Sequence, residues 1–533
     1  MTPSSSRLVL ALFANLALAT TSCGVFGSDD SPSAPEAPEA PAADADGGAL
    51  DGSTLPPVGG PASQNELTDE LGVFVAETGR DTGSGSHTSP FASIQVGIDR
   101  AKAVGKRVYV CAGTYKESLV IANAISIIGG LDCTALEWRL GVGFSRVESS
   151  SSPVVKATNI TVTTRLEGLE VVAPNATAPS GSSIGLLADR AGALVMARSK
   201  ITAGDAMNGV DGLEGAQLAN AATTKGAAIP GAAQCSGTLC PAFARPPGGA
   251  GGTNICTGAP GHVGQTGGAG GSGGHWDVTQ TTVGMTTTQQ FVVHNGNDVT
   301  FGLTKAATGF TGGAGVDGPD GPAPAATGTI SSTGYTPADG GKGTDGAPGS
   351  GGAGGDGLQP GTVVYTPTPV GAEYRGWGGG GGGAGGCPGL SGTSGRGGGA
   401  SIGALLIDSP MTFDASQLSS RAGGNAGKGT LGSARLPGGV RNNPEIPGQY
   451  PELAPALGHD GGRGGAAGIS SNGSNGPSIA IAHAGAAPTL SGGTTTTHGT
   501  GGAAIASRSQ TIAGIVKTIP ATTAGVAQDV LAF

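Results

Sequence analysis

Two Gly-x-Ser-x-Gly motifs, centred on Ser183 and Ser401, are the most catalytic-looking residues of this chain. In hydrolases with this motif, a strained turn exposes the serine as a nucleophile, and one histidine and one acid complete the triad. A hydrolase needs one such serine, whereas here two copies occupy equivalent positions of an internal repeat. We therefore interpret both as a structural feature of the repeat.

Other acids and histidines give no catalytic pattern. Asp81 begins an Asp-Thr-Gly-Ser sequence typical of aspartic proteases, but a second Asp-Thr-Gly is absent and Gly79-Arg80 precede it instead of an apolar strand. This context favours a turn. The seven histidines form no His-x-x-x-His or Glu-x-x-His pair, so the sequence indicates no catalytic metal, and we predict no cofactor.

Calcium binding has one weak candidate, Asp356. The stretch 351–359 fits the Gly-Gly-x-Gly-x-Asp nonapeptide of calcium-binding repeat proteins, whose carbonyls and carboxylates are oxygen ligands. Partial matches end at Asp317 and Asp345, but their spacing is irregular, whereas tandem calcium repeats recur every nine residues. A chance match is expected at this glycine content.

The N-terminus predicts export. Arg7 precedes an apolar run, Leu8–Ala19, which is too short to span a bilayer but typical of a signal peptide. The run ends at Thr20-Thr21-Ser22-Cys23, which resembles a bacterial lipobox, although Thr20 stands where leucine is usual. We expect a signal peptide at 1–22 and lipidation of Cys23 at the outer membrane or cell surface; a soluble exported protein is the alternative.

Negative charge is concentrated in the segment that follows this predicted anchor. The net charge of −10 argues against nucleic-acid binding, and ten acids with no Lys or Arg lie between Gly24 and Gly72. We predict that residues 23–70 form the lipid anchor and an acidic tether rich in Pro, Ala and Ser, because they hold too few apolar side chains to fold.

Six cysteines remain, an even number that permits three disulfides in an exported chain. A zinc site at Cys235-x4-Cys240-x15-Cys256 is the alternative, but it lacks a second close pair. The sequence leaves open the pairing of Cys235, Cys240, Cys256 and Cys387.

The elements that must position these residues are short strands. From residue 71 onward, runs of three to five apolar and β-branched residues alternate with short turns, and one helix is predicted over Phe91–Ala103 after Pro90. Strands this short stack well as coils of about 20–25 residues in a parallel solenoid. The sequence 181–189 recurs at 399–408 and more weakly at 476–482, each time followed by a short strand and a Gly-rich excursion. We predict one solenoid over 71–208 and 400–533, with loops leaving from the same corner.

Three motifs carry a resemblance to a known family. The stretches Val73–Asp81, Ser89–Gln95 and Val108–Glu117 resemble an N-terminal bacterial domain of unknown function within the pectin-lyase-like superfamily. The resemblance covers 60 to 100 residues and implies an all-β fold, a right-handed parallel β-helix with long Gly-rich insertions and one short N-terminal helix. The anchored, Gly-rich arrangement resembles exported lipoproteins of myxobacterial type. In such a fold Cys111 and Cys133 lie one coil apart and are expected to pair.

The same resemblance suggests a place to look for activity. Enzymes of this superfamily cut acidic polysaccharides with clustered aspartates aided by calcium or a basic residue. The nearest such group here is Asp189, Arg190 and Arg198, for which ordinary surface solvation is the competing interpretation.

The largest insertion, 209–399, holds 57 of the 105 glycines. Ordering so many glycines in ordinary strands or helices costs roughly 0.5–1 kcal/mol each, so regular structure is not expected for most of it. The alternatives are a flexible low-complexity coat, extended polyglycine-like strands packed side by side, or calcium binding. One hairpin is predicted near 290–302, from Phe291–Val293 and Val299–Phe301 around Asn295-Gly296.

Two functions fit these features. The first is a non-catalytic cell-surface lipoprotein, structural or adhesive, that contacts extracellular matrix. The second is a β-helix that binds or cleaves polysaccharide, which requires convergent charged groups or exposed aromatic rings on a strand face; the rings to inspect are Trp138, Trp276 and Trp377.

Overall fold

The structure is a computed structural model. It describes residues 60–134, 137–141, 143–221, 223, 226–227, 248–270, 311–356, 379–441 and 457–533, and the backbone of 275–283 and 286–294. The predicted signal peptide, Cys23, the tether up to residue 59, Cys235, Cys240 and Trp377 lie outside these residues, as do the side chains of Trp276 and its neighbours in 271–310.

The described chain is all-β with one α-helix, and its three main sheets are parallel throughout. Across sheet 1 the strands are β1 (Gly72–Val75), β2 (Arg107–Cys111), β5 (Ile127–Leu131), β8 (Thr164–Glu167), β11 (Leu194–Ala197), β20 (Thr412–Asp414) and β23 (Thr489–Ser491). Across sheet 2 they are β3 (Gly113–Lys116), β6 (Ser145–Glu148), β9 (Leu169–Val172), β12 (Lys200–Thr202), β21 (Gln417–Ser419) and β24 (Thr495–Thr497). Across sheet 3 they are β4 (Leu119–Ile121), β7 (Val155–Thr158), β10 (Ser183–Asp189), β19 (Ser401–Ile407), β22 (Ser478–Ala484) and β27 (Ala527–Ala532).

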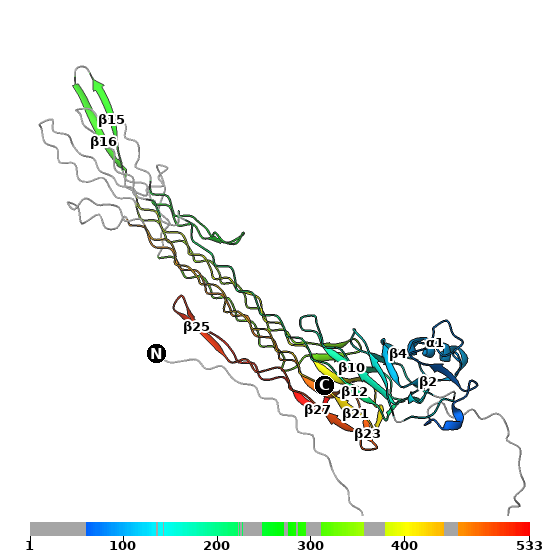
Figure 1. Cartoon of the computed structure of the whole chain (residues 1–533). Coiled ribbons are helices and arrows are strands. Elements are labelled where there is room, and N and C mark those ends of the chain that lie inside the picture. The colour runs from blue at the N-terminus through cyan, green and yellow to red at the C-terminus, as the bar shows by residue number, and fades with distance from the viewer. Residues whose placement is uncertain are drawn as a thin grey trace, which may run out of the picture. The chain divides into compact units, whose positions relative to one another are not determined.

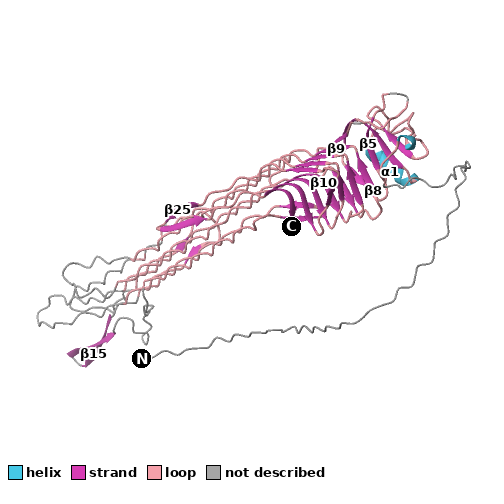
Figure 2. Cartoon of the chain, turned by 90° about the horizontal axis from the view of Figure 1, so that it is seen from below, coloured by secondary structure: helices cyan, strands magenta, loops and turns pink. Residues whose placement is uncertain are grey.

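The chain passes through sheets 1, 2 and 3 in turn, and each passage, called a coil below, adds one strand to each sheet (Figure 2). The last three coils are interrupted between sheet 2 and sheet 3 by insertion 1 (203–400), insertion 2 (420–477) and insertion 3 (498–526). All three insertions therefore leave from the same corner, as the repeat predicts. The repeat itself is confirmed by register, because Ser183 pairs with Ser401 and Ser401 with Ser478.

Side chains that alternate inward along these strands form one continuous core. Most inward positions are followed by an apolar partner one coil later, for example Leu166, Met196 and Phe413 in sheet 1, all of which are buried. Leu406 in sheet 3 is an exception, because the buried His483 follows it. This stacking explains how a chain with only 4% aromatic residues fills an interior: each coil buries small apolar side chains against the next.

The one α-helix of the described residues, α1 (Ile94–Val104), covers the first coil with Ile94, Ile98 and Ala101 fully buried, and a 3-10 turn, η1 (Gln64–Glu66), precedes β1. Residues of two of the motifs named above, Ser89–Gln95 and Val108–Glu117, hydrogen-bond to each other at the N-terminus of α1. The carboxylate of Glu117 accepts hydrogen bonds from the amides of Ile94 (2.7 Å) and Gln95 (2.9 Å) and from the Ser93 hydroxyl (2.8 Å). A negative charge at a helix N-terminus satisfies the unpaired amides there and complements the helix dipole.

Four antiparallel hairpins complete the strands: β13 (Asn254–Ile255) with β14 (Val263–Gly264), β15 (His275–Val283) with β16 (Thr286–His294), β17 (Thr329–Ser331) with β18 (Gly334–Thr336), and β25 (Arg508–Ile512) with β26 (Ile515–Ile519). The hairpin predicted around Asn295-Gly296 has its turn and its second strand, Val299–Phe301, outside the described residues. Its first strand, Phe291–Val293, pairs with residues 276–278. The two nine-residue strands of this described hairpin are rich in β-branched residues, which favour strands.

The described Gly-rich stretches of the three insertions run side by side and form what we call the glycine bundle (Figure 1). It comprises 204–221, 248–270, 311–328, 337–356, 379–399, 422–441, 457–477, 499–504 and 520–526. Hydrogen bonds join neighbouring stretches at every third residue: the amides of Gly312, Gly315, Gly318 and Gly321 donate to the carbonyls of Asp460, Arg463, Ala466 and Ile469. A three-residue period is that of an extended left-handed helix, which makes no internal hydrogen bonds. Of the three alternatives, the described residues adopt side-by-side packing.

Steric contact explains the glycine at each third position. A Cβ atom on Gly349 would lie 2.1 Å from the carbonyl oxygen of Gly462, and one on Gly352 would lie 2.1 Å from that of His459. The stretch 379–399 makes backbone hydrogen bonds to five other described stretches of the bundle, and 13 of its 21 residues are glycine. As in collagen, only glycine fits where backbones approach this closely.

Candidate functional site

The outer face of sheet 2 gathers the charged side chains that sequence analysis left unassigned. In each strand the residues alternate between the core and this face, so outward residues align in rows across the coils. One row is Thr114, Arg146, Glu170, Lys200, Gln417 and Thr495, and the other is Lys116, Glu148, Val172, Thr202, Ser419 and Thr497. We call these two rows the sheet-2 face.

Ion pairs order its central part. The guanidinium of Arg146 contacts Glu148 (Nε–Oε1, 3.1 Å) and Glu170 (Nη1–Oε2, 3.4 Å), and these side chains are about one third exposed. The hydrogen bond to Glu148 is the main cause that raises the pKa of Arg146 above its usual value. Lys200 adds a cation whose Nζ lies 4.5 Å from the centre of the Phe144 ring. The sheet-2 face therefore offers acids, bases and one half-buried ring within a few strands.

The candidate group of Asp189, Arg190 and Arg198 is divided between two ion pairs. Asp189 ends β10 and pairs with Arg190 (Oδ2–Nη2, 3.1 Å), whereas Arg198 follows β11 and pairs with Glu167. Strand β11 lies between the two groups along the chain. Glu167 is buried and is bound by both Arg198 and Arg165, and no motif in the sequence singled it out.

The serines of the Gly-x-Ser-x-Gly motifs are structural. Ser183 and Ser401 are fully buried. The Ser183 hydroxyl donates to the carbonyl of Pro174 (2.7 Å) and accepts from the amide of Gly204 (2.8 Å). Ser401 likewise donates to the carbonyl of Gly204 (2.7 Å) and accepts from the amide of Arg421 (2.9 Å). Each hydroxyl thus binds the backbone where an insertion leaves the coil, and none is available as a nucleophile.

Asp81 also has a structural role. Its Oδ1 accepts hydrogen bonds from the amides of Ala92 (3.0 Å) and Ser93 (2.9 Å), which agrees with the turn favoured by its sequence context. Among the described residues, no group of three or more His, Cys, Asp or Glu side chains is arranged to hold a metal ion.

The aspartates of the calcium-like motifs bind backbone rather than converge. Asp317 Oδ1 accepts from the amide of Ala466 (2.6 Å), and Asp345 Oδ1 accepts from the amide (2.7 Å) and hydroxyl (3.0 Å) of Ser391. Asp356 is exposed at the end of a described stretch. These carboxylates thus satisfy backbone amides of neighbouring stretches, as carbonyl oxygens do elsewhere in the bundle.

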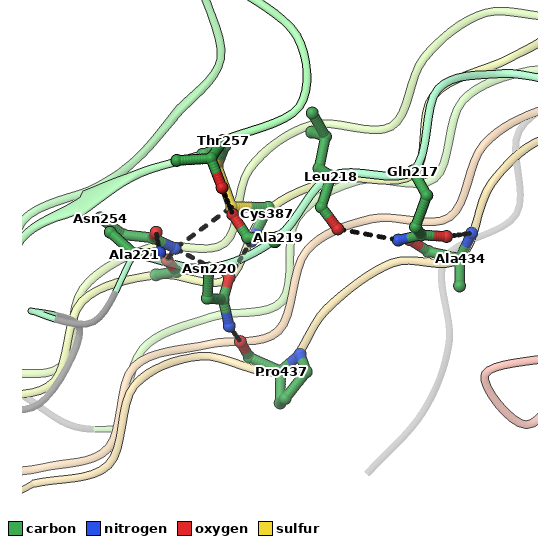
Figure 3. The surroundings of a disulfide bond; sticks show 12 residues. Gln217, Leu218, Ala219, Asn220, Ala221, Asn254, Thr257, Cys387, Ala434 and Pro437 are labelled. Carbon is green, nitrogen blue, oxygen red and sulfur yellow. Dashed lines mark hydrogen bonds between the residues drawn. A yellow bond between two sulfur atoms is a disulfide. The ribbon is translucent and has the colours of Figure 1, made fainter.

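Two disulfides are present among the described residues. Cys111 is bonded to Cys133, the pairing expected for neighbouring coils, and Cys256 is bonded to Cys387 across 131 residues. The second bond excludes Cys256 from the zinc alternative. Around it, Asn254 Nδ2 donates to Asn220 Oδ1 (3.0 Å), and Asn220 Nδ2 donates to the carbonyl of Pro437 (2.8 Å) (Figure 3). This disulfide therefore links stretches of the bundle that are distant in sequence.

An open cavity of about 900 Å³ lies beside the Cys111–Cys133 disulfide, lined by Glu77, His87, Asp132, Trp138 and Arg139 among others. Trp138 is buried against Phe74 (ring centres 4.8 Å apart), and its Nε1 donates to the carbonyl of His87 (3.2 Å). The ring is therefore no stacking platform for a sugar. Trp276 and Trp377 have no described side chain.

No protein family, curated protein or solved structure matches this chain. Within the described residues, no helix is long and apolar enough to cross a membrane.

Proposed function

We propose that this protein is a non-catalytic, exported lipoprotein of the cell surface, built as a right-handed parallel β-helix that carries a stiff glycine bundle. In this proposal the N-terminal lipid at Cys23 holds the protein at the outer membrane or cell surface, the acidic tether spaces the fold from it, and the folded part contacts extracellular matrix.

One observation carries this proposal: the residues of catalytic type are bound to backbone. The hydroxyls of Ser183 and Ser401 and the carboxylate of Asp81 each accept amide hydrogen bonds. Meanwhile a large part of the chain builds an ordered bundle. A long, regular projection suits a structural or adhesive role.

Polysaccharide binding is the second candidate, favoured by the sheet-2 face. Its rows repeat at the strand spacing of about 4.8 Å and present Arg146, Glu148, Glu170 and Lys200 with hydrogen-bonding Thr and Gln side chains. An extended, partly anionic polymer fits such a ladder better than a compact ligand does.

One experiment separates the two candidates from catalysis. The purified protein is incubated with a panel of acidic polysaccharides, and both binding and cleavage are measured. Arg146→Ala plus Lys200→Ala is compared against Arg100→Ala plus Lys102→Ala, which removes two exposed cations of α1 outside the sheet-2 face. Binding that the first pair weakens at least tenfold and the second leaves unchanged supports a binding face. Cleavage that Glu148→Gln or Glu170→Gln abolishes would overturn the non-catalytic role.

Anchoring is tested separately by Cys23→Ser. The substitution is expected to release the protein from the membrane fraction and to abolish labelling by a fatty-acid probe, while Cys235→Ser leaves both unchanged. Unchanged membrane partitioning of Cys23→Ser would refute lipidation.

A further inference from the structure

The outgoing stretches of insertions 1 and 2 keep the register of sheet 2 after the strands end. In that sheet, Thr202 of β12 pairs with Ser419 of β21, 217 positions later. Farther out, side-chain oxygens of insertion 1 accept hydrogen bonds from amides that again lie 217 positions later. These pairs are Asp205 with Ala422, Asn208 with Asn425, Asp211 with Lys428, and Gln217 with Ala434. The offset therefore stays constant where strand gives way to extended helix.

The returning stretches keep the register of sheet 3 in the same way. Ser401, the first residue of β19, donates from its amide to the carbonyl of Pro477, 76 positions later. Five glycine amides of the stretch 379–399 also donate to carbonyls 76 positions later, namely the amides of Gly398, Gly395, Gly389, Gly386 and Gly383. One offset thus holds from a strand of the coils to the far part of the bundle.

The glycine repeat by itself does not select this offset. Where every third residue is glycine, a shift of three positions brings another set of glycines to the same places, so neighbouring stretches can pair at several offsets. Register is weakly specified in Gly-rich strands for this reason. An extended left-handed helix also makes no internal hydrogen bonds, so a single stretch keeps its shape only against a neighbour.

The coils supply the apolar contacts that select a register. Their continuous core includes Leu418 of β21 and Ile481 of β22, and a slip by one residue would turn such side chains outward. The apolar clusters of the described bundle hold only a few side chains each. The Cys256–Cys387 disulfide fixes one contact of the bundle, but its two cysteines must meet before it can form.

We propose that the coils set the register of the glycine bundle and that the bundle forms outward from them. Each strand that ends at the shared corner places the first triplet of its insertion opposite that of the next coil, and every later triplet continues the same offset. The bundle is then a continuation of the stacked coils and not a separate domain. This inference does not depend on the surface role proposed above.

Pulsed hydrogen exchange during refolding tests the proposal on the full chain carrying Cys23→Ser, with both described disulfides intact. Mass spectrometry of peptides from the labelled protein reports when the amides of each region become protected. We expect amides of the coils, in 107–202, to become protected before amides of the bundle, in 379–399. Bundle amides that become protected first, or together with those of the coils, would overturn the proposal.

Asp205→Ala and Asp211→Ala form a matched pair, because each removes one carboxylate that accepts a hydrogen bond from an amide of insertion 2. Asp205 lies three residues after β12, and Asp211 lies two triplets farther out. Outward growth makes the first contact before the second. Asp205→Ala is therefore expected to slow protection of the bundle about threefold or more, and Asp211→Ala by less than about twofold. Equal slowing by the two substitutions, or greater slowing by Asp211→Ala, would contradict outward growth.

Discussion

At the scale of single residues, the glycine bundle requires residues without a Cβ atom where neighbouring backbones approach closely. A Cβ on Gly315 would lie 2.0 Å from the carbonyl oxygen of Ala347 and 2.7 Å from the amide nitrogen of Gly465. Both are backbone atoms, which cannot move without shifting a neighbouring helix. We expect Gly315→Ala to lower the free energy of unfolding by about 1–3 kcal/mol, measured by urea denaturation.

The control is two residues away. A Cβ on Gly313 would meet only the Ser350 hydroxyl, at 3.4 Å, so Gly313→Ala is expected to change stability by less than about 1 kcal/mol. Equal losses from both substitutions would show that glycine is required for chain flexibility rather than for close approach.

A buried phenol makes a second prediction at this scale. Burial raises the pKa of Tyr335 to about 12, although the Gly328 amide donates to its oxygen. The unfolded phenol ionises near pH 10, so between pH 10 and about 12 the folded state holds the extra proton and stability falls as the pH rises. The loss reaches about 2–3 kcal/mol. It should be smaller in Tyr335→Phe, measured by unfolding at pH 9 to 12; identical curves would contradict this.

At the scale of elements, the start of α1 is stabilised by the carboxylate of Glu117, which lies between β3 and β4. Glu117→Gln keeps the shape of the side chain but removes the charge that faces three donors at the helix start. We expect a loss of about 1–2 kcal/mol and a lower helical signal in circular dichroism. Glu170→Gln, which removes a partly exposed ion-pair partner 3.4 Å from Arg146, should cost less than about 1 kcal/mol. The reverse order would show that Glu117 does not cap the helix.

At the scale of the whole molecule, the Cys256–Cys387 disulfide joins stretches 131 residues apart, whereas Cys111–Cys133 closes 22 residues. A longer closed loop restricts the unfolded chain more, so Cys256→Ser plus Cys387→Ser is expected to cost about 2–5 kcal/mol. Limited proteolysis followed by mass spectrometry should then show faster cleavage within insertion 1 while the coils stay protected. Faster cleavage in the coils first would assign the disulfide a different role.

Local pattern and internal repeat by themselves determine much of this protein. Short β-branched runs predict short strands, and the recurrence of 181–189 at 399–408 predicts equivalent strands. These features follow from the spacing of apolar side chains along the chain, which is a local property. The Cys111–Cys133 pairing is implied by the family resemblance and is present. The predicted anchor and tether rest on the sequence alone.

Only the tertiary structure decided which distant backbones meet. It gave the Gly-x-Ser-x-Gly serines carbonyl and amide partners, aligned Arg146, Glu170 and Lys200 on one face, and placed Phe291–Val293 against 276–278. It also set the glycine stretches at a distance where a neighbour's carbonyl occupies the Cβ position. Such contacts join residues up to about two hundred positions apart, for example Ser401 and Gly204, and no local pattern encodes the partner of a glycine.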